Sequence, residues 1–248
     1  MIGGERVLAL IPARAGSKGL PGKNVMDLCG RPLLGWPVQA ALGSRHVDRV
    51  VVSTDDAGFA AIARAQGAET PFLRPAEFAS DTARSADVVI HALDALAAAG
   101  DDFGYLVLLE PTSPLTEAAD IDAALSRLAD QRAVADAVVG ISRVEVAHPD
   151  FDVLRDGAGL IRPAFAASFA VMGRRQELSE LYFVEGSLYI SAVAAFRACR
   201  GFYHERTLGH ALPRWKSFEV DELVDLVCIE ALMRNRDRLA AASGDGHG

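Results

Sequence analysis

Short apolar runs alternate along the chain with longer segments in which apolar residues recur at helical spacing. A strand buried on both faces is a continuous apolar run, whereas a helix that covers a sheet has apolar residues three and four apart. The pattern predicts strands at 6–10, 48–55, 105–114, 136–142 and 186–193. It predicts helices at 31–44, 56–67, 82–100, 118–132 and 221–241.

This alternation is typical of the α/β class, with a mostly parallel, Rossmann-like sheet flanked by helices. In such sheets ligands bind at the carboxyl ends of the strands. We expect one domain over 1–242 that contains an irregular arm at 143–185, where the pattern dissolves into mixed polar and aromatic residues. Residues 243–248, SGDGHG, are predicted to form a disordered tail.

Composition narrows the range of partners. The formal net charge of −8 argues against a nucleic-acid polymer, but a small anionic ligand responds to local charge. Three scattered cysteines, Cys29, Cys199 and Cys228, form no metal or redox motif and fit a reducing compartment. The sequence has neither an apolar run of membrane-spanning length nor the regions of a signal peptide. We therefore expect a cytoplasmic protein that binds neither nucleic acid nor membrane.

Positive charge gathers directly after the first predicted strand, in LIPARAGSKGLPGKN at 10–24. Arg14, Lys18 and Lys23 supply the charge, and three glycines let backbone N–H groups approach a ligand closely. A lysine about 4 Å from a phosphate charge contributes roughly 4 kcal/mol at an effective dielectric near 20. The spacing fits neither a Walker loop nor a dinucleotide fingerprint. The segment therefore predicts a polyphosphate site of another kind; the alternative is a solvated, flexible turn.

The loop resembles the signature of the acylneuraminate cytidylyltransferases, also called CMP-sialic acid synthetases. The resemblance continues in the family's order and covers most of the chain, through VVSTDD, LRPAEFASDTARSADVVIHAL, LLEPTSPLT, RRQELSELYFVEGSLYI and FEVDELVDL. Such enzymes transfer a nucleoside monophosphate from CTP to the anomeric hydroxyl of an α-keto acid sugar and release pyrophosphate. The resemblance implies the nucleotide-diphospho-sugar transferase fold, CTP and a nine-carbon sugar as substrates, and a homodimer that forms through the arm.

The resemblance also implies which residues bind the nucleotide. They are Arg14, Lys18, Lys23, Asn24, Arg74, Ser80 and Ser85. The three cations would contact the triphosphate, whereas Arg74 and Ser85 match positions that recognise the base or ribose. Considered alone, Arg74 could instead form a surface ion pair with Glu77, and Ser85 could be a helix N-cap.

On the sugar side the resemblance implies Glu110, Arg175, Gln176 and Glu185. Arg175 is the candidate for the substrate carboxylate, because a guanidinium can bind it bidentately. Three positions depart from the sialic-acid enzymes: Glu110 replaces a glutamine, Glu185 an asparagine and Thr116 an arginine. A carboxylate only accepts hydrogen bonds, whereas an amide also donates them, so these departures bear on the identity of the sugar.

FEVDELVDL is the block that supplies metal ligands in the family. Glu219 and Asp221 are two residues apart, so on a strand they would face the same way. Two carboxylates suit Mg²⁺, which takes its other ligands from phosphates and water. Asp221 could also be the N-cap of the last helix, and Asp225 is expected on that helix surface. Arg14, Lys23 and Asp221 are the predicted catalytic residues.

The sequence thus predicts a Mg²⁺-dependent transfer of CMP from CTP to a sialic-acid-like sugar. The departures on the sugar side leave two alternatives open. One is a nucleotidyltransferase for legionaminic or pseudaminic acid, including one that uses GTP. The other is a non-catalytic regulatory protein that binds a nucleotide.

Overall fold

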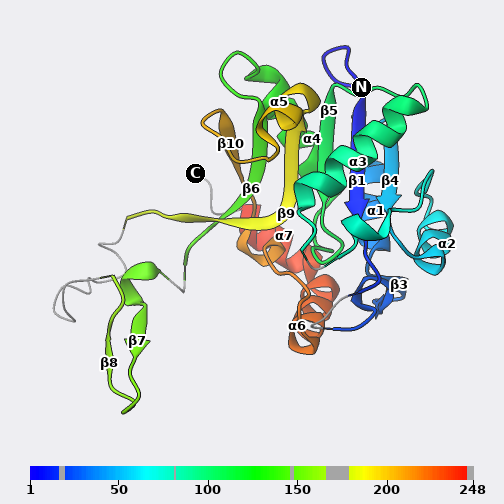
Figure 1. Ribbon diagram of the computed structural model, residues 1–248. Coiled ribbons are helices and arrows are strands. Elements are labelled where there is room, and N and C mark those ends of the chain that lie inside the picture. The colour runs from blue at the N-terminus through cyan, green and yellow to red at the C-terminus, as the bar shows by residue number, and fades with distance from the viewer. Residues whose placement is uncertain (17–19, 81, 146–147, 166–178, 245–248) are drawn as a thin grey trace.

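The computed structural model describes residues 1–16, 20–80, 82–145, 148–165 and 179–244. A six-stranded sheet in the order β10-β6-β9-β5-β1-β4 forms its centre (Figure 1). The strands are β1 (Val7–Pro12), β4 (Arg49–Ser53), β5 (Tyr105–Leu109), β6 (Ala137–Arg143), β9 (Tyr182–Ala192) and β10 (Thr207–Ala211). β9 runs antiparallel to β5 and β6, while the other pairings in this sheet are parallel. The mostly parallel sheet expected from the sequence is confirmed.

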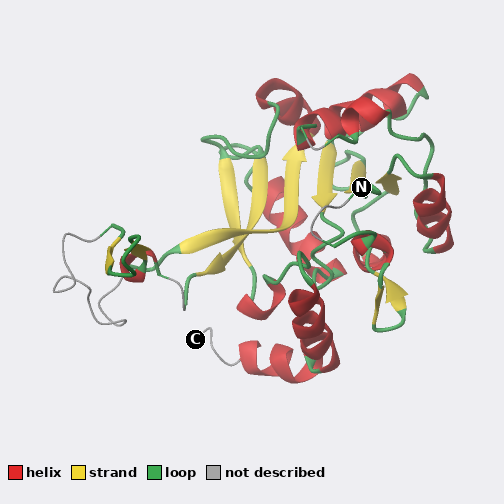
Figure 2. Cartoon of the chain, turned by 60° about the horizontal axis from the view of Figure 1, so that its bottom comes forward, coloured by secondary structure: helices red, strands yellow, loops and turns green. Residues whose placement is uncertain are grey.

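Helices pack on both faces of the sheet (Figure 2). One face is covered by α1 (Gly35–Gly43), α2 (Ala57–Ala65) and α4 (Ala118–Asp130). The opposite face is covered by α3 (Ser85–Ala98) and α5 (Val193–Cys199). Because β1, β4 and β5 are buried from both sides, their sequences are largely apolar rather than alternating.

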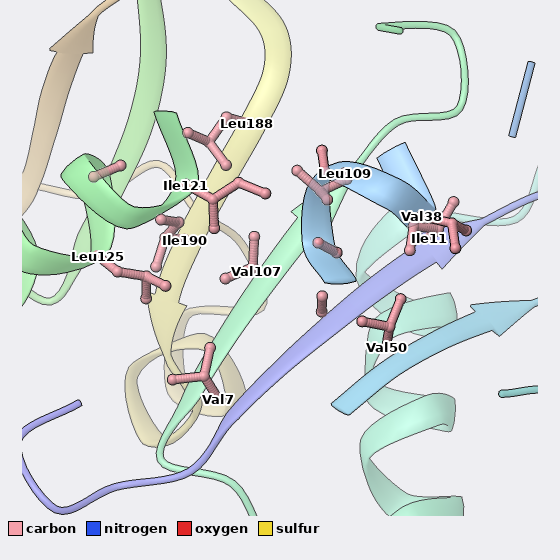
Figure 3. Close-up of a cluster of buried hydrophobic side chains, with 14 of the residues drawn as sticks. Val7, Ile11, Val38, Val50, Val107, Leu109, Ile121, Leu125, Leu188 and Ile190 are labelled. Atoms are coloured by element: carbon pink, nitrogen blue, oxygen red, sulfur yellow. The ribbon is translucent and has the colours of Figure 1, made fainter. Parts of the chain in front are cut away.

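Successive residues of β1 enter different cores. Val7 and Ile11 belong to the cluster under α1 and α4, whereas Leu8 and Leu10 belong to the cluster under α3. This follows from the alternation of side chains along a strand. Figure 3 shows the first cluster, in which Ile121 and Leu125 of α4 lie against Val107 and Ile190 and Val38 of α1 lies beside Ile11.

A third, smaller cluster lies beyond the carboxyl ends of the strands. It joins the hairpin of β2 (Asp27–Leu28) and β3 (Arg31–Pro32) to the helix α6 (Leu223–Arg234) and the short helix η6 (Arg214–Lys216). Its buried members are Leu28, Leu33, Leu115, Trp215, Val220 and Ile229. The cluster fixes the C-terminal helices against the loop that follows β1.

The arm expected at 143–185 contains a two-stranded hairpin of β7 (Val153–Arg155) and β8 (Ile161–Pro163). The short helix η3 (Pro149–Phe151) precedes it. The hairpin stands away from the main body, beyond the outer end of β9 (Figure 1). The segment showed neither helical spacing nor strand alternation, because most of the apolar residues that the structure describes in it are exposed rather than packed on a core.

The last predicted helix, 221–241, is two helices. α6 ends at Arg234, and α7 (Arg236–Gly244) begins after Asn235. The disordered tail was expected to begin at residue 243, but residues 243 and 244 belong to α7. Residues 245–248 lie outside the described residues. Within the part of the chain that the structure describes, no helix is long and apolar enough to span a membrane.

Candidate active site

Several segments far apart in the sequence meet at one edge of the sheet. The parallel strands β1, β4 and β5 end there, at Pro12, Ser53 and Leu109. Antiparallel β9 passes the same edge, because its Leu188 pairs with Leu109. The cationic loop, the STDD segment and Glu110 are thus adjacent, as the rule for ligand sites in parallel sheets predicts.

The loop after β1 is held in place by hydrogen bonds. The backbone N–H of Ala15 donates to Oδ1 of Asp55 at 3.1 Å, so a residue that follows β4 supports the loop. The buried amide of Asn24 donates through Nδ2 to the carbonyl oxygen of Arg14 at 3.0 Å. In this structure Asn24 shapes the loop from within, which gives it a role besides the predicted nucleotide contact.

Five of the predicted site residues line one cavity of about 240 Å³. They are Arg14, Arg74, Ser80, Ser85 and Glu110. Phe78 and Leu108 are among the apolar residues that complete the wall. A cavity with two guanidinium groups, two hydroxyls and an apolar wall has the chemistry to hold a nucleoside with an attached phosphate.

Arg74 is buried, with 5% of its surface exposed. Its Nη2 donates to the Ser53 carbonyl oxygen at 3.0 Å, and its own N–H donates to the Thr54 carbonyl oxygen. Nε has no partner in the described part of the chain. Burial lowers the pKa of this guanidinium, and Asp55 opposes that effect. The alternative of a surface ion pair is therefore wrong, because the side chain lies inside the cavity wall.

Ser85 is the first residue of α3, and the N-cap position is occupied by Arg84. The alternative interpretation of Ser85 as an N-cap is therefore wrong. The exposed hydroxyl of Ser85 is instead available at the cavity wall. Ser80 also lies at this wall, where its Oγ is within 3.2 Å of Oγ1 of Thr82.

Lys23 connects the loop to a segment 198 residues later. Gly22 has a φ of 69°, a left-handed conformation that glycine adopts readily, and Lys23 follows it in the short helix η1 (Lys23–Val25). Its Nζ donates to Oδ1 of Asp221 at 3.0 Å and to the Val220 carbonyl oxygen at 3.1 Å. The ammonium group thus lies between the loop and the predicted metal ligands.

Glu219 and Asp221 do not lie on a strand, as the sequence had suggested, but in an irregular segment between η6 and α6. Burial raises the pKa of Glu219, the charge of Asp221 raises it further, and Lys23 opposes both. Asp221 is not the N-cap either. Asp225 Oδ2 accepts from the backbone N–H groups of Asp221, at 3.0 Å, and Glu222, at 2.8 Å. Asp225, expected to be a plain surface residue, therefore holds this segment in place.

Glu110 follows β5 directly and faces the cavity. Burial raises its pKa to about 7, and the nearby charge of Glu219 acts in the same direction. The cations Lys23 and Arg74 oppose this rise. The carboxyl group of Glu110 thus lines the nucleotide cavity and also interacts electrostatically with Glu219, one of the predicted metal ligands.

Glu185 is buried in β9, with 2% of its surface exposed. Ser187 Oγ donates to its Oε1, and Oε2 has no partner among the described residues. Burial raises the pKa of Glu185 to about 7, against the hydrogen bond from Ser187 and together with the charge of Glu219. Gly140 permits this position, because a Cβ there would lie 2.1 Å from Oε1 of Glu185.

Gly186 leaves room for the side chain of Glu219 to approach β9 closely. It has a φ of 79°, and a Cβ on it would lie 1.8 Å from Oε1 of Glu219. Glu185 and Glu219 are therefore neighbours only because glycines stand where the side chains approach the strand. The spacing of the two glutamates in the sequence gives no sign of this contact.

The donor set suits a hard divalent cation that is shared with a ligand. No group of three or more histidine, cysteine, aspartate or glutamate side chains in the described ranges could hold a metal ion by itself. Magnesium commonly takes one or two carboxylates and completes its shell with phosphates and water. Glu219 and Asp221 meet that requirement, and a phosphate held by Lys23 would lie beside them.

Three predicted site residues, Lys18, Arg175 and Gln176, lie outside the described residues. Conversely, the sequence analysis missed Asp55, which supports the loop, and Phe78, which lines the cavity. Asp55 carried a usable signal, since it follows the second parallel strand at the ligand edge. Phe78 carried none, because it reaches the cavity from the short helix η2 (Ala76–Phe78).

Comparison with known proteins shows which family this chain resembles. The family model described as Cytidylyltransferase matches residues 8–194. The CMP-N,N′-diacetyllegionaminic acid synthase of Legionella pneumophila is 33% identical over 230 residues, which cover 92% of this chain and 96% of that protein. The N-acylneuraminate cytidylyltransferase of Escherichia coli is 29% identical over 94% of this chain, which spans 53% of that protein's length.

A solved structure agrees at the level of the fold. The CMP:2-keto-3-deoxy-manno-octonic acid synthetase complexed with CTP has a TM-score of 0.66 to this chain. The match covers 93% of this chain and 99% of that one, at 19% identity. The family model spans most of the chain, and the similarity to the Legionella protein is nearly end to end. This chain therefore belongs to the cytidylyltransferase family.

Proposed function

We propose that this protein transfers CMP from CTP to the anomeric hydroxyl of a nonulosonic α-keto acid sugar and releases pyrophosphate. The observation that carries the proposal is the shared cavity of Arg14, Arg74, Ser80, Ser85 and Glu110 at the carboxyl ends of the strands. The Legionella and Escherichia relatives are named for the synthesis of CMP-linked sugars of this class. Neither name favours a GTP-dependent enzyme or a non-catalytic regulatory protein.

The proposed reaction is an in-line displacement at the α-phosphorus. The anomeric oxygen of the sugar forms the new P–O bond as the bond to pyrophosphate breaks. Negative charge then builds on the leaving group, where Arg14 and Lys23 are positioned to offset it. Lys23 is held before the substrate arrives by Asp221 and the Val220 carbonyl oxygen, and the backbone of Arg14 is fixed by the hydrogen bond from Asn24.

We propose Mg²⁺ as the cofactor, with Glu219 and Asp221 as its protein ligands. When bound, the ion would stabilise charge on the attacking and leaving oxygens. Lys23 already pairs with Asp221, so the same carboxylate would link the ion to the loop that holds the phosphates. Treatment with EDTA should abolish turnover, and excess Mg²⁺ should restore it.

The sugar would bind on the acidic side, near Glu110 and Glu185. These carboxyl groups stand where the sialic-acid enzymes carry amides, and burial raises the pKa of both to about 7. Around neutral pH such groups can donate as well as accept a hydrogen bond, much as an amide does. Arg175 and Gln176 complete the proposed sugar contacts.

The test is pyrophosphate release with a matrix of substrates. CTP and GTP are each combined with N-acetylneuraminic, legionaminic and pseudaminic acid, and with no sugar. We expect release with CTP and at least one of the three sugars, and formation of the CMP-sugar in equal amount. Binding of CTP without pyrophosphate release from any sugar would contradict the proposal, and release with GTP alone would contradict the choice of nucleotide.

We propose that the chain acts as a homodimer in the cytoplasm. Apolar side chains are exposed on the arm, at Val153 and Ile161, on the outer part of β9, at Phe183, and on α6, at Val224 and Val227. Exposed apolar patches commonly mark interaction sites. The three cysteines are free and exposed, as suits a reducing compartment. Light scattering at micromolar concentration should give the mass of two chains; the mass of one chain would contradict the dimer.

A further inference from the structure

A second and larger cavity, of about 520 Å³, lies outside the nucleotide site. It is enclosed by α1, the loop between β5 and α4, the short helix η6, and the junction of α6 with α7. In the described part of the chain it shares no lining residue with the nucleotide cavity. Its volume falls within the range of small-molecule sites, about 300–1,000 Å³.

The walls of this cavity are aromatic and fixed. Trp36 and Trp215 both line it, together with Leu115 and Met233. The indole Nε1 of Trp36 donates to the Leu28 carbonyl oxygen at 3.1 Å, which holds the ring in its orientation. Fixed indole rings favour a ligand with a flat apolar or aromatic body, because stacking then costs little ordering of the protein.

Two polar groups of the wall lack hydrogen-bond partners. They are the Nε1 of Trp215 and the Oγ1 of Thr116, neither of which has a partner among the described residues. Trp215 is 9% exposed and Thr116 is 5% exposed, and the two atoms are themselves buried, so neither water nor a ligand in the cavity reaches them in this structure.

The rim of the cavity is positively charged. Arg234 and Arg236 line it, and so do the first residues of α4, whose N-terminus is capped by the carboxylates of Glu117 and Asp120. Arg234 pairs with Glu230 at 2.5 Å, and Arg236 lies 3.6 Å from Asp237, but both side chains are largely exposed.

One carboxylate also lines the cavity, that of Glu117. Its Oε2 accepts from Lys216 Nζ at 2.7 Å, and Lys216 is buried at this contact. The pairing offsets the negative charge of Glu117. The net effect of the lining charges therefore favours an anion.

We propose that this cavity is a second ligand site, which binds a small molecule with a flat aromatic or apolar body and one anionic group. The body lies between Trp36 and Trp215. The anionic group faces Arg234 and Arg236 at the rim. The proposal concerns binding and does not depend on the reaction at the nucleotide site.

The chain offers a direct readout, because it contains two tryptophans and both line the cavity. The probe is 8-anilino-1-naphthalenesulfonate, an aromatic anion that accepts energy from excited indole. We expect saturable energy transfer with one probe per chain. The uncharged N-phenyl-1-naphthylamine serves as the comparison probe, since it shares the aromatic body but lacks the sulfonate.

Two sets of variants locate the bound probe. Ala119→Phe fills the cavity from α4 and should weaken binding of the sulfonate about tenfold or more, whereas Ala123→Phe, on the same helix but away from the cavity, should change it less than about twofold. Replacing Arg234 and Arg236 together by glutamine should weaken the sulfonate roughly threefold or more and leave the uncharged probe unaffected. Melting temperatures show that each variant is folded.

The proposal is overturned if the sulfonate does not bind, or if Ala119→Phe binds it as well as Ala123→Phe does. If the arginine replacement weakens both probes equally, the assignment of an anionic group is overturned. Energy transfer that is lost with Ala119→Phe and weakened for the sulfonate alone by the arginine replacement supports the whole proposal.

Discussion

The two edges of the central sheet hold their carboxylates in opposite ways. Where the parallel strands begin, Asp48 and Asp136 each precede a strand and each has hydrogen-bond donors. Hydrogen bonds from Arg206 and Arg132 lower the pKa of Asp136 to about 2. Burial opposes the ionisation of Asp48, but the N-terminal ammonium and the Val7 N–H lower its pKa nonetheless. These charges stabilise the fold.

Where the strands end, the carboxyl groups are buried with too few donors. Burial raises the pKa of Glu110 and of Glu185 to about 7, and it raises the pKa of Glu219 as well. The charge of Glu219 also raises the pKa of both Glu110 and Glu185, while Lys23 lowers the pKa of Glu110 and of Glu219. This edge therefore costs stability in the free protein, and carboxyl groups perturbed in this way concentrate at functional sites.

The contrast teaches that one sheet keeps its stabilising charges and its chemistry at opposite ends. Burial distinguishes the two edges, because the side chains of Asp48 and Asp136 keep 23% and 22% of their surface exposed, whereas Glu185 keeps 2%. The supply of donors differs as well. Arginines and backbone N–H groups serve the carboxylates at the first edge, whereas at the second edge Ser187 donates to Glu185 and Lys23 pairs with Asp221. Substitutions at each edge should therefore have effects of opposite sign on stability.

Lys23→Ala should have the largest effect, because it removes the preorganised positive charge beside the leaving pyrophosphate. We expect kcat/KM to fall about 10²–10³-fold. The fold should be retained, since Asp221, the partner of Lys23, is mostly exposed. Steady-state pyrophosphate release measures the loss, and circular dichroism confirms the fold.

Arg197→Ala is the matched control for Lys23→Ala. It removes one exposed cation that pairs with Asp94, far from the loop, and changes the net charge equally. Its kcat/KM should stay within about twofold of the wild-type value, because exposed ion pairs contribute little. A folded Lys23→Ala variant with the same turnover as this control would refute the assignment of Lys23.

Glu185→Gln should raise stability at high pH. The pKa of Glu185 is about 7 in the folded protein, above the ordinary value of 4.5, so the folded state loses stability as the pH rises from about 4.5 through 7. The amide cannot ionise and should be more stable than wild type by up to about 3 kcal/mol at pH 8. Urea unfolding at pH 5 and pH 8 measures it; a variant less stable than wild type at pH 8 would show that the carboxylate is well paired.

Asp136→Asn should have a smaller effect of the opposite sign. The pKa of Asp136 is about 2 when folded, below the ordinary 3.8, so its contribution is present above about pH 4 and disappears as the pH falls towards 2. We expect a loss of about 1–2 kcal/mol in the free energy of unfolding at pH 7, which vanishes near pH 2. Asp130→Asn, at the exposed end of α4, is the control. Equal stability of the two variants at pH 7 would contradict the role given to Asp136.

Local patterns were sufficient to predict the core of the fold. Strands buried on both faces are largely apolar, so β1, β4, β5, β6 and the second part of β9 were found from single segments. Residues 182–185, the mostly exposed start of β9, were assigned to the arm instead. β10, TLGHA, was not found, because it is a short strand of only partly buried residues at the edge of the sheet. The break at Asn235 was missed as well, since neither glycine nor proline stands at the boundary between α6 and α7.

The nucleotide side of the site was easier to predict than the acidic side. Arg14 follows β1 closely, and Arg74 and Ser85 lie in one contiguous motif at 73–93, so local patterns marked all three residues that the structure brings to one cavity. The approach of Glu185 and Glu219 depends on Gly186, whose missing side chain leaves room for a glutamate 33 residues later. Such an approach depends on tertiary packing, which cannot be predicted from a local sequence pattern.

The central claim is that the loop after β1 holds the phosphate tail of the nucleotide, and calorimetric binding of CTP and CMP tests it most directly. The two ligands share base, ribose and α-phosphate, so their difference in affinity isolates the β- and γ-phosphates. We predict that wild type binds CTP at least about tenfold more tightly than CMP and that Lys23→Ala loses most of this preference. Equal affinities of wild type for CTP and CMP would contradict the account.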